Sequence, residues 1–497
     1  MTGGAGHRRT LRNAGWIFLH RSVSGCAVLV AHALFARMLL PAEVGLYHLA
    51  VFVGVVAGTL ACGGLSSAAT RFIALEVGRG CGTGAAIARR VLLAAAIGVA
   101  LVAAVGVATA SLCPASWRPA SLGAMVGFLA AHSVRLVAAG LAGGFAEFGA
   151  QARASLAASL VMPAGAVWLW FHGGDVSSAL WVTAAHAAAT AGIVLLQLRG
   201  RLRAGEALQP VVARRIWRYC GGVTTILLLD VVVWQQSEAV FLRLLSAPTQ
   251  LGLYAVAFSL ATQAMQLVPG SLGAAMLSAL AYQVGKGDER DLKASVSRST
   301  RLLAVGALPI AAFGALFADE VMVVLYGAEF GEGASALRIL WSGTAAGTVA
   351  MAAAAVLYAS GRERVLVAIG LPVAALNIAL DVALIAPLGA IGAAFANSMT
   401  QIVGGAVAVC AADRILGGST VPWRSLIRIA AATAAAAIAA SWARAGSVGV
   451  ECLLRGAASF GAVLLVGLFA LREVSMGEVK DLLRGKGLAG GGSRTVR

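Results

Sequence analysis

The chain has 497 residues, of which 60% are hydrophobic and only 12% are charged, and its mean hydropathy is +0.87. A soluble domain does not need that much apolar surface, so the composition excludes an ordinary soluble protein and indicates a polytopic membrane protein. The net charge of +17 is also typical of nucleic-acid-binding proteins, and the positions of the basic residues distinguish the two explanations.

Apolar segments long enough to cross a hydrocarbon core, which takes about 20 helical residues, recur along the whole chain. The alternating pattern of a membrane β-barrel is absent from the sequence. The first apolar segment follows basic residues but has no cleavage site, so we interpret it as a retained helix rather than a signal peptide. We predict an all-α polytopic membrane protein with fourteen transmembrane helices, at residues 15–36, 44–68, 88–111, 119–142, 153–172, 178–198, 216–242, 251–277, 299–318, 333–359, 364–386, 388–411, 425–443 and 449–471.

The basic residues lie mainly on one side of this predicted topology. If the N-terminus is cytoplasmic, 30 of the 38 lysines and arginines fall on cytoplasmic connections and tails, and six fall at outer connections. The remaining two, Arg21 and Arg135, lie inside helices. This bias is the positive-inside rule. The charge therefore predicts cytoplasmic N- and C-termini and contact with anionic head groups, and it does not require nucleic acid as a partner.

Two parts of the sequence repeat each other. When Gly45 is aligned with Gly252, an offset of 207 residues, the segment 45–80 matches without a gap at 13 of 36 positions, where about four are expected by chance. The copies begin at the first and seventh predicted helices, so the repeat unit is six helices and the copies have parallel topology. We predict two six-helix lobes related by a pseudo-twofold axis, at 1–210 and 211–412, then two accessory helices at 413–473 and a cytoplasmic tail at 474–497.

Five stretches, together with the helix count, resemble one known group of transporters. They are RMLLPAEVGLYHLA after the first helix, GGLSSAATRFIALEVGRG at the end of the second, LGLYAVAFSLA opening the eighth, LYGAEFGEGASALRIL before the tenth, and LYASGRERVLVAIGLPVAALNIALDVALIAPLGAIGAAFANSMTQ across the tenth to twelfth. The chain is similar to the multidrug/oligosaccharidyl-lipid/polysaccharide superfamily, and within it to the polysaccharide-transporter branch of lipid-linked oligosaccharide flippases. The resemblance covers residues 11 to 411.

This resemblance implies a flippase of the bacterial inner membrane. It would move undecaprenyl-diphosphate-linked oligosaccharide across the membrane by alternating access, for the synthesis of O-antigen, capsule or exopolysaccharide. Its partners would be the lipid-linked glycan, membrane lipids, a polysaccharide polymerase and assembly proteins, and a coupling H⁺ or Na⁺. A lipid II flippase and a cation-coupled multidrug antiporter of the same fold are alternatives; the first would carry several arginines in helices one, two and eight, where only Arg21 lies deep.

We predict no enzyme activity, no cofactor and no metal site. The seven cysteines have no CxxC spacing, and no phosphate-binding GxxxxGK[ST] motif occurs, so ATP is not used directly. A membrane glycosyltransferase or ligase acting on the same lipids is the enzyme alternative, and it would need a catalytic carboxylate on a sizeable outer loop. The longest outer connection, around residues 319–338, has four carboxylates but no DxD or ExD spacing.

Arg135 is the first candidate for substrate binding. A charge at the middle of a membrane helix costs about 3 kcal/mol on insertion scales, and a guanidinium can hydrogen-bond two phosphate oxygens together. His132 lies one turn earlier on the same face. The structural alternative for Arg135 is an ion pair with a buried carboxylate such as Asp230. Arg21 is the second cavity candidate, and its alternative is to extend to the head groups.

The seventh predicted helix is the most polar. We predict Gln235 and Gln236 as substrate-binding residues, and Asp230 and Glu238 as ion-coupling residues, because a carboxylate in low dielectric can take up and release a proton near neutral pH. Asn377, in the segment LNIALDVALIAP with Asp381, is a further candidate for binding sugar hydroxyls. Each of these polar groups can instead bond to a neighbouring helix.

Overall fold

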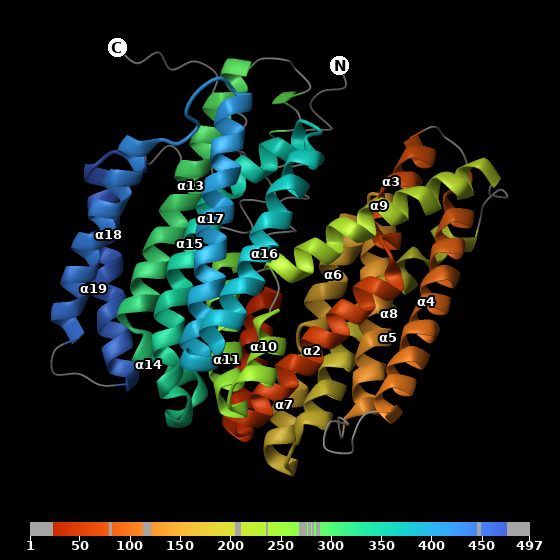
Figure 1. Ribbon diagram of the computed structural model, residues 1–497, viewed down its shortest axis with the longest axis horizontal. Helices are drawn as coiled ribbons and strands as arrows, with labels where there is room; N and C mark the ends of the chain where they lie inside the picture. The colour runs from red at the N-terminus through yellow and green to blue at the C-terminus, as the bar shows by residue number, and fades with distance from the viewer. Residues whose placement is uncertain are drawn as a thin grey trace. The chain divides into compact units, whose positions relative to one another are not determined.

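A computed structural model of the chain describes residues 23–78, 82–112, 121–203, 210–234, 237–267, 276, 280, 283–284, 289–444 and 449–474. The regular structure of these residues is helical, and eleven of their helices are long and apolar enough to cross a membrane. The chain is therefore an all-α multi-pass membrane protein, as predicted. It divides into two compact units, one from Val23 to Ala255 and one from Val256 onward (Figure 1).

The first unit, red to yellow-green in Figure 1, packs its helices around one apolar core. Helices α3, α4, α5, α8 and α9 all contribute to this core, in which Ile73, Ile87 and Leu141 are fully buried. α11 (Pro248–Leu267) begins in this unit and continues into the second. The other helices are, in chain order, Val23–Met38, α2 (Pro41–Cys62), α3 (Leu65–Gly78), α4 (Gly84–Leu112), α5 (Leu122–Gly144), α6 (Phe148–Ala158), α7 (Val161–His172), α8 (Val176–Arg203), α9 (Pro210–Trp234) and α10 (Glu238–Leu245).

The second unit, green to blue in Figure 1, has α15 and α17 packed along each other and a hairpin of α18 and α19 beside α13. Glycine allows the close approach of α15 to α17, because a Cβ on Gly343 would lie 2.3 Å from the Cα of Ser398. Its helices are α13 (Glu289–Leu316), α14 (Ala318–Tyr326), the 3-10 turn η2 (Ala328–Gly333), α15 (Ala334–Ala359), α16 (Glu363–Leu388), α17 (Ala390–Ile415), α18 (Trp423–Arg444) and α19 (Gly449–Ala470).

Three of the predicted helices are interrupted. The segment 44–68 lies in α2 and α3, which are separated by Gly63 and Gly64 with φ of 47° and 73°. Glycine adopts this left-handed backbone without strain, and a Cβ on Gly64 would lie 2.9 Å from the Cys220 carbonyl oxygen of α9. The segment 153–172 divides between α6 and α7, and 216–242 divides between α9 and α10. Apolar length predicts how much chain is buried in the membrane, and it does not locate these breaks.

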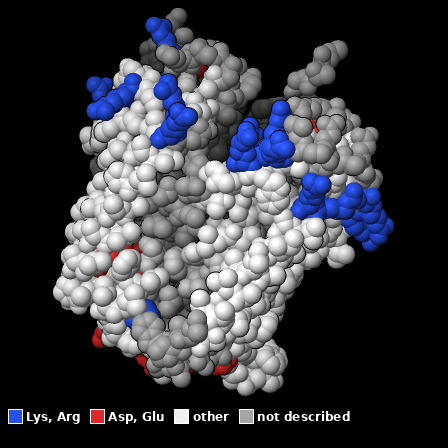
Figure 2. Space-filling model, turned by 45° about the vertical axis from the view of Figure 1, so that its right-hand side comes forward, with Lys and Arg blue, Asp and Glu red and all other residues white. Residues whose placement is uncertain are grey.

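The charged residues gather at the ends of the helices. Figure 2 shows Lys and Arg side chains mainly toward the upper end of each unit and Asp and Glu side chains mainly toward the lower end, with uncharged surface between them. Such a band without charges is the surface that a hydrocarbon core requires.

Candidate functional site

Arg135 lies near the middle of α5, inside a membrane-crossing helix of the first unit. Its side chain is half-buried, and its guanidinium Nη2 lies 3.3 Å from the Nδ1 atom of His132. Within the part of the chain that the structure describes, no carboxylate pairs with Arg135. The side chain of Asp230, its predicted alternative partner, lies outside the described residues. Arg135 therefore carries hydrogen-bond donors that suit an anionic ligand.

His132 is held in place by the helix α2. The imidazole is buried, its ring centre lies 5.4 Å from that of Phe128, and a Cβ on Gly58 would lie 3.2 Å from its Cδ2 atom. The absence of a side chain at Gly58 thus lets α2 approach α5 at this point. Since His132 is fixed by packing and contacts Arg135, it orients the guanidinium.

Of the other site residues predicted in this part of the chain, the structure describes the side chain of Glu238 alone. Glu238 is fully buried at the first residue of α10. Asp230 belongs to α9, but its side chain is not among those described. Arg21, Gln235 and Gln236 lie outside the described residues.

In the second unit, buried polar side chains of α16 and α17 meet. The Asn377 Nδ2 donates to the Thr400 Oγ1 at 3.3 Å, and the Gln401 Nε2 donates to the Asn397 Oδ1 at 2.7 Å. Asp381, one turn after Asn377 on α16, is fully buried. The sequence named Asn377 as a sugar-binding candidate, and the structure places it, also fully buried, among these groups.

This cluster has the chemistry of a site for a proton or a small cation. A carboxylate inside a membrane helix is costly unless its charge is compensated, and the neighbouring amide and hydroxyl groups supply the hard oxygen ligands that such cations prefer. Among the described residues, no group of three or more His, Cys, Asp or Glu side chains lies close enough to hold a metal ion. The region therefore combines one buried carboxylate, that of Asp381, with the amide and hydroxyl groups that meet at Asn377, one turn earlier on α16.

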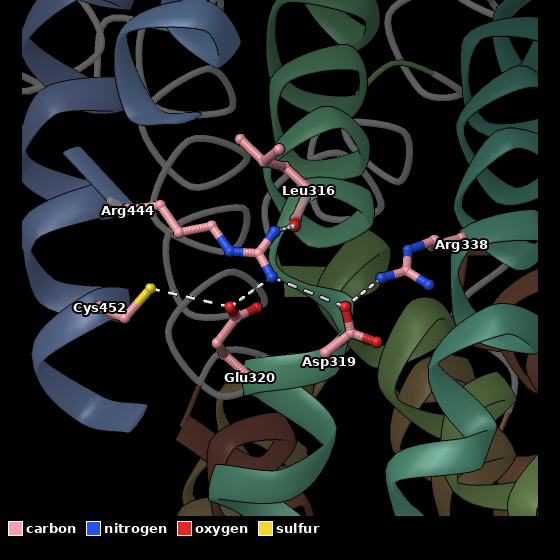
Figure 3. Close-up of polar contacts among 6 residues, drawn as sticks. All are labelled: Leu316, Asp319, Glu320, Arg338, Arg444 and Cys452. Atoms are coloured by element: carbon pink, nitrogen blue, oxygen red, sulfur yellow. Dashed lines mark hydrogen bonds and ion pairs between the residues drawn. The ribbon is translucent and has the colours of Figure 1, made fainter. Parts of the chain in front are cut away.

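Two carboxylates of the longest predicted outer connection form ion pairs with arginines. Residues 319–338 are not an open loop, because they form α14, η2 and the start of α15. Figure 3 shows Asp319 and Glu320 of α14 pointing toward arginines of neighbouring helices. The Arg444 Nη2 lies 2.7 Å from the Glu320 Oε1 and 3.8 Å from the Asp319 Oδ2, and Arg338 also pairs with Asp319.

Arg444 connects the α18–α19 hairpin to the rest of the second unit. Besides its two ion pairs, its Nη1 donates to the carbonyl oxygen of Leu316, at the end of α13, at 3.2 Å (Figure 3). Arg338 and Arg444 are two of the six arginines that the predicted topology places at outer connections. Their charges are compensated by carboxylates, which explains why these exceptions to the positive-inside pattern are tolerated.

Two family models match the sequence. A family model described as "Polysaccharide biosynthesis protein" matches residues 34–335, and one described as "Lipid II flippase MurJ" matches residues 222–451. A search of curated protein sequences found no match.

Solved structures share the fold at low sequence identity. A lipid II flippase MurJ in an inward closed conformation is 12% identical with a TM-score of 0.74, and the match covers 93% of this chain and 99% of that one. An inward-facing multidrug resistance MATE family transporter of the MOP superfamily is 16% identical, with a TM-score of 0.64 over 81% of this chain and 98% of that one. A MOP superfamily transporter from Pyrococcus furiosus is 16% identical, with a TM-score of 0.61 over 82% of this chain and 96% of that one.

These matches confirm the predicted family and the prediction that the chain is not an enzyme. The match to the polysaccharide biosynthesis model extends over more than half of the chain, and the fold is that of MOP superfamily transporters. The chain therefore belongs to the polysaccharide biosynthesis protein family, and it shares the fold of solved MOP superfamily transporters.

Proposed function

We propose that this protein is a flippase for lipid-linked oligosaccharide, and that Arg135 binds the diphosphate of the lipid head group during translocation. The observation that carries the proposal is the position of Arg135: a half-buried guanidinium in the middle of α5, oriented by His132 and without a carboxylate partner among the described residues. Family membership supports a substrate of polysaccharide biosynthesis. The carried lipid would be undecaprenyl diphosphate bearing an oligosaccharide for O-antigen, capsule or exopolysaccharide.

We also propose a more detailed architecture for the chain. It comprises fourteen membrane spans, a lobe at 1–210, a lobe at 211–412, accessory helices at 413–473 and a cytoplasmic tail at 474–497. The two lobes would be parallel repeats that work by alternating access in the bacterial inner membrane, with both termini in the cytoplasm. The 13 identities in 36 aligned positions at the offset of 207 support the repeat.

Energy coupling is proposed at buried carboxylates. Asp230 and Glu238 are the residues predicted from sequence, and Glu238 is fully buried at the start of α10. The structure adds Asp381, which is fully buried one turn after Asn377 on α16. Because a charged carboxylate is costly inside a membrane helix, binding of H⁺ or Na⁺ would neutralise it there.

The test is a translocation assay in proteoliposomes that contain undecaprenyl diphosphate carrying a labelled oligosaccharide. An impermeant sugar-modifying enzyme added outside measures the fraction of lipid that has crossed the bilayer. We expect wild type to expose the inner-leaflet lipid and Arg135→Ala to lose at least tenfold in rate. Arg135→Lys keeps the charge but lacks the planar fork, so it should retain an intermediate rate. Arg153→Ala, an exposed arginine of α6 in the same unit, is the matched control.

The assay also distinguishes the proposed function from the alternative transport functions. Equal rates for wild type and Arg135→Ala would remove Arg135 from the substrate site. If wild type translocated lipid II but not the oligosaccharide lipids, the lipid II alternative would replace the proposal. Proton-dependent efflux of a cationic dye, with no lipid translocation, would favour a multidrug antiporter.

A further inference from the structure

The first unit carries an exposed basic surface that lies outside the proposed transport site. It consists of Arg71 on α3 and of Arg214, Arg215, Trp217 and Arg218 on the first turns of α9, all of them exposed. We refer to these five residues as the α3–α9 basic surface. Figure 2 shows basic side chains gathered at the upper end of this unit.

The first turns of α9 are amphipathic, and this places the basic residues outward. Ala213, Ile216 and Cys220 are buried, at spacings of three and four residues, and the last two belong to the core that α9 shares with α3, α4, α5 and α8. A helix face is defined by that spacing. Four of the five residues between them, three arginines and a tryptophan, are therefore held exposed on the opposite face.

Arg71 is stacked on aromatic rings rather than loosely extended. Its Cζ atom lies 4.9 Å from the ring centre of Tyr219 and 5.9 Å from that of Phe72. These two rings are 5.7 Å apart and edge to face, at 82°. A guanidinium held over a ring by cation–π attraction keeps N–H donors, which can form two hydrogen bonds to one phosphate.

Among the described residues, no carboxylate compensates the charge of this surface. None of its four arginines pairs with a carboxylate of the described residues, whereas Arg201 on α8 of the same unit pairs with Glu147 at 3.3 Å. Four uncompensated guanidinium groups favour an anionic partner. Trp217 is 55% exposed beside them. Because exposed tryptophan concentrates at the interface between membrane and water, this surface and its partner are expected to lie at that interface.

We propose that the α3–α9 basic surface binds the phosphates of anionic phospholipid head groups in the cytoplasmic leaflet, with Arg71 and Arg218 as the residues in contact. The positive-inside distribution assigns this end to the cytoplasm, where the leaflet is negatively charged. The five side chains are exposed, and no described residue encloses them in a pocket. Such an open surface suits a lipid present at high concentration, whereas a scarce carrier lipid requires an enclosed pocket to be selected. The partner is therefore bulk phospholipid and not the transported substrate.

The experiment measures lipid binding and does not depend on translocation. Purified full-length protein is equilibrated separately with phosphatidylglycerol, phosphatidylethanolamine and undecaprenyl diphosphate, and bound lipid is counted by native mass spectrometry. We expect wild type to retain phosphatidylglycerol in preference to phosphatidylethanolamine. Arg71→Gln and Arg218→Gln should each lower the affinity for phosphatidylglycerol about fivefold, the value of one basic residue at an anionic surface. Arg201→Gln, whose arginine is already paired, should match wild type.

Two further variants keep the test decisive. Arg71→Lys should lose part of the affinity, because it retains the charge without the planar fork. The double variant Arg214→Gln/Arg215→Gln changes only exposed residues, for which no contact with Tyr219 is seen. It provides a second test of the surface if the protein does not tolerate substitution of Arg71. Equal retention of phosphatidylglycerol by wild type and by Arg71→Gln/Arg218→Gln overturns the proposal, as does a loss confined to undecaprenyl diphosphate.

Discussion

Gly45 of α2 and Gly252 of α11 lie against each other, at positions that the sequence repeat makes equivalent. A Cβ on Gly45 would lie 2.8 Å from the backbone nitrogen of Gly252, and a Cβ on Gly252 would lie 1.8 Å from the carbonyl oxygen of Pro41. Both helices begin at equivalent prolines, Pro41 and Pro248. Both positions therefore require glycine, because a Cβ at either one would overlap atoms of the other helix.

Alanine at position 252 should destabilise this crossing. The added methyl group would overlap the backbone of α2, and overpacking of this kind costs about 1–3 kcal/mol. We expect Gly252→Ala to lower the melting temperature in detergent, measured by the fluorescence of the protein during heating. Gly106→Ala is the control, because a Cβ there has no neighbour within 4 Å. Equal melting temperatures for the two variants would show that α2 and α11 are not held this closely.

The ion pairs of Arg444 should stabilise the second unit more than an exposed pair does. The Glu320 side chain is only 13% exposed, so Arg444→Ala leaves a largely buried carboxylate and the Leu316 carbonyl without this donor. We expect a loss of about 1–3 kcal/mol in the free energy of unfolding, the range for stranding a buried polar group. The measurement is thermal unfolding of the purified protein.

Arg455 provides the matched control for Arg444. It pairs with Glu451 at 2.5 Å on the surface of α19, and both side chains are more than half exposed. An exposed pair four residues apart on a helix contributes about 0.5 kcal/mol or less. If Arg455→Ala destabilised the protein as much as Arg444→Ala, the cluster of Figure 3 would have no special role in holding the hairpin.

Asp175 should give α8 a stability that depends on pH. Its Oδ1 accepts a hydrogen bond from the backbone nitrogen of Ser178 at 2.9 Å, and the Ser178 Oγ accepts one from the Asp175 nitrogen at 2.8 Å. The hydrogen bond from the Ser178 backbone lowers the pKa of this carboxyl group. A lowered pKa stabilises the fold above the unfolded value of about 3.9, and this stabilisation disappears as the pH falls through the folded value.

The cap can be separated from the charge by two substitutions. Asp175→Ala should cost about 1 kcal/mol near neutral pH, as removal of a helix cap does. Asp175→Asn keeps a capping oxygen without titrating, so its melting temperature should approach that of wild type below pH 4. Because Asp175 is exposed, solvent screening keeps this difference small. A constant difference from pH 3 to pH 7 would contradict the assignment.

Removing the charge of Asp381 should remove any dependence of transport on a cation gradient. In the proteoliposome assay we expect a proton or sodium gradient to accelerate wild type and to leave Asp381→Asn unaffected, since a neutral amide cannot be neutralised by either ion. Glu329→Gln, which changes an exposed carboxylate in η2, should respond as wild type does. If Asp381→Asn still responds to the gradient, Asp381 is not the coupling residue, and Asp230 and Glu238 are the remaining candidates.

Much of the architecture could be predicted because the hydrocarbon core imposes a length and a polarity on every helix that crosses it. The predicted segment 333–359 corresponds to α15 at Ala334–Ala359, and 449–471 corresponds to α19 at Gly449–Ala470. The predicted start at 299 was wrong for α13, which begins at Glu289. Its first turns are polar and extend the helix beyond the apolar segment from which the prediction was made.

By itself, the sequence determined the class of the protein, the approximate helices, the repeat and the identity of the rare intramembrane charges, because each of these is a local or periodic property of the chain. Tertiary structure decided which polar groups meet: Arg135 with His132, Asn377 with Thr400, and the outer carboxylates with Arg338 and Arg444. Except for the pair within α5, these contacts join separate helices. Their geometry depends on how the helices pack, and no local pattern of residues encodes it.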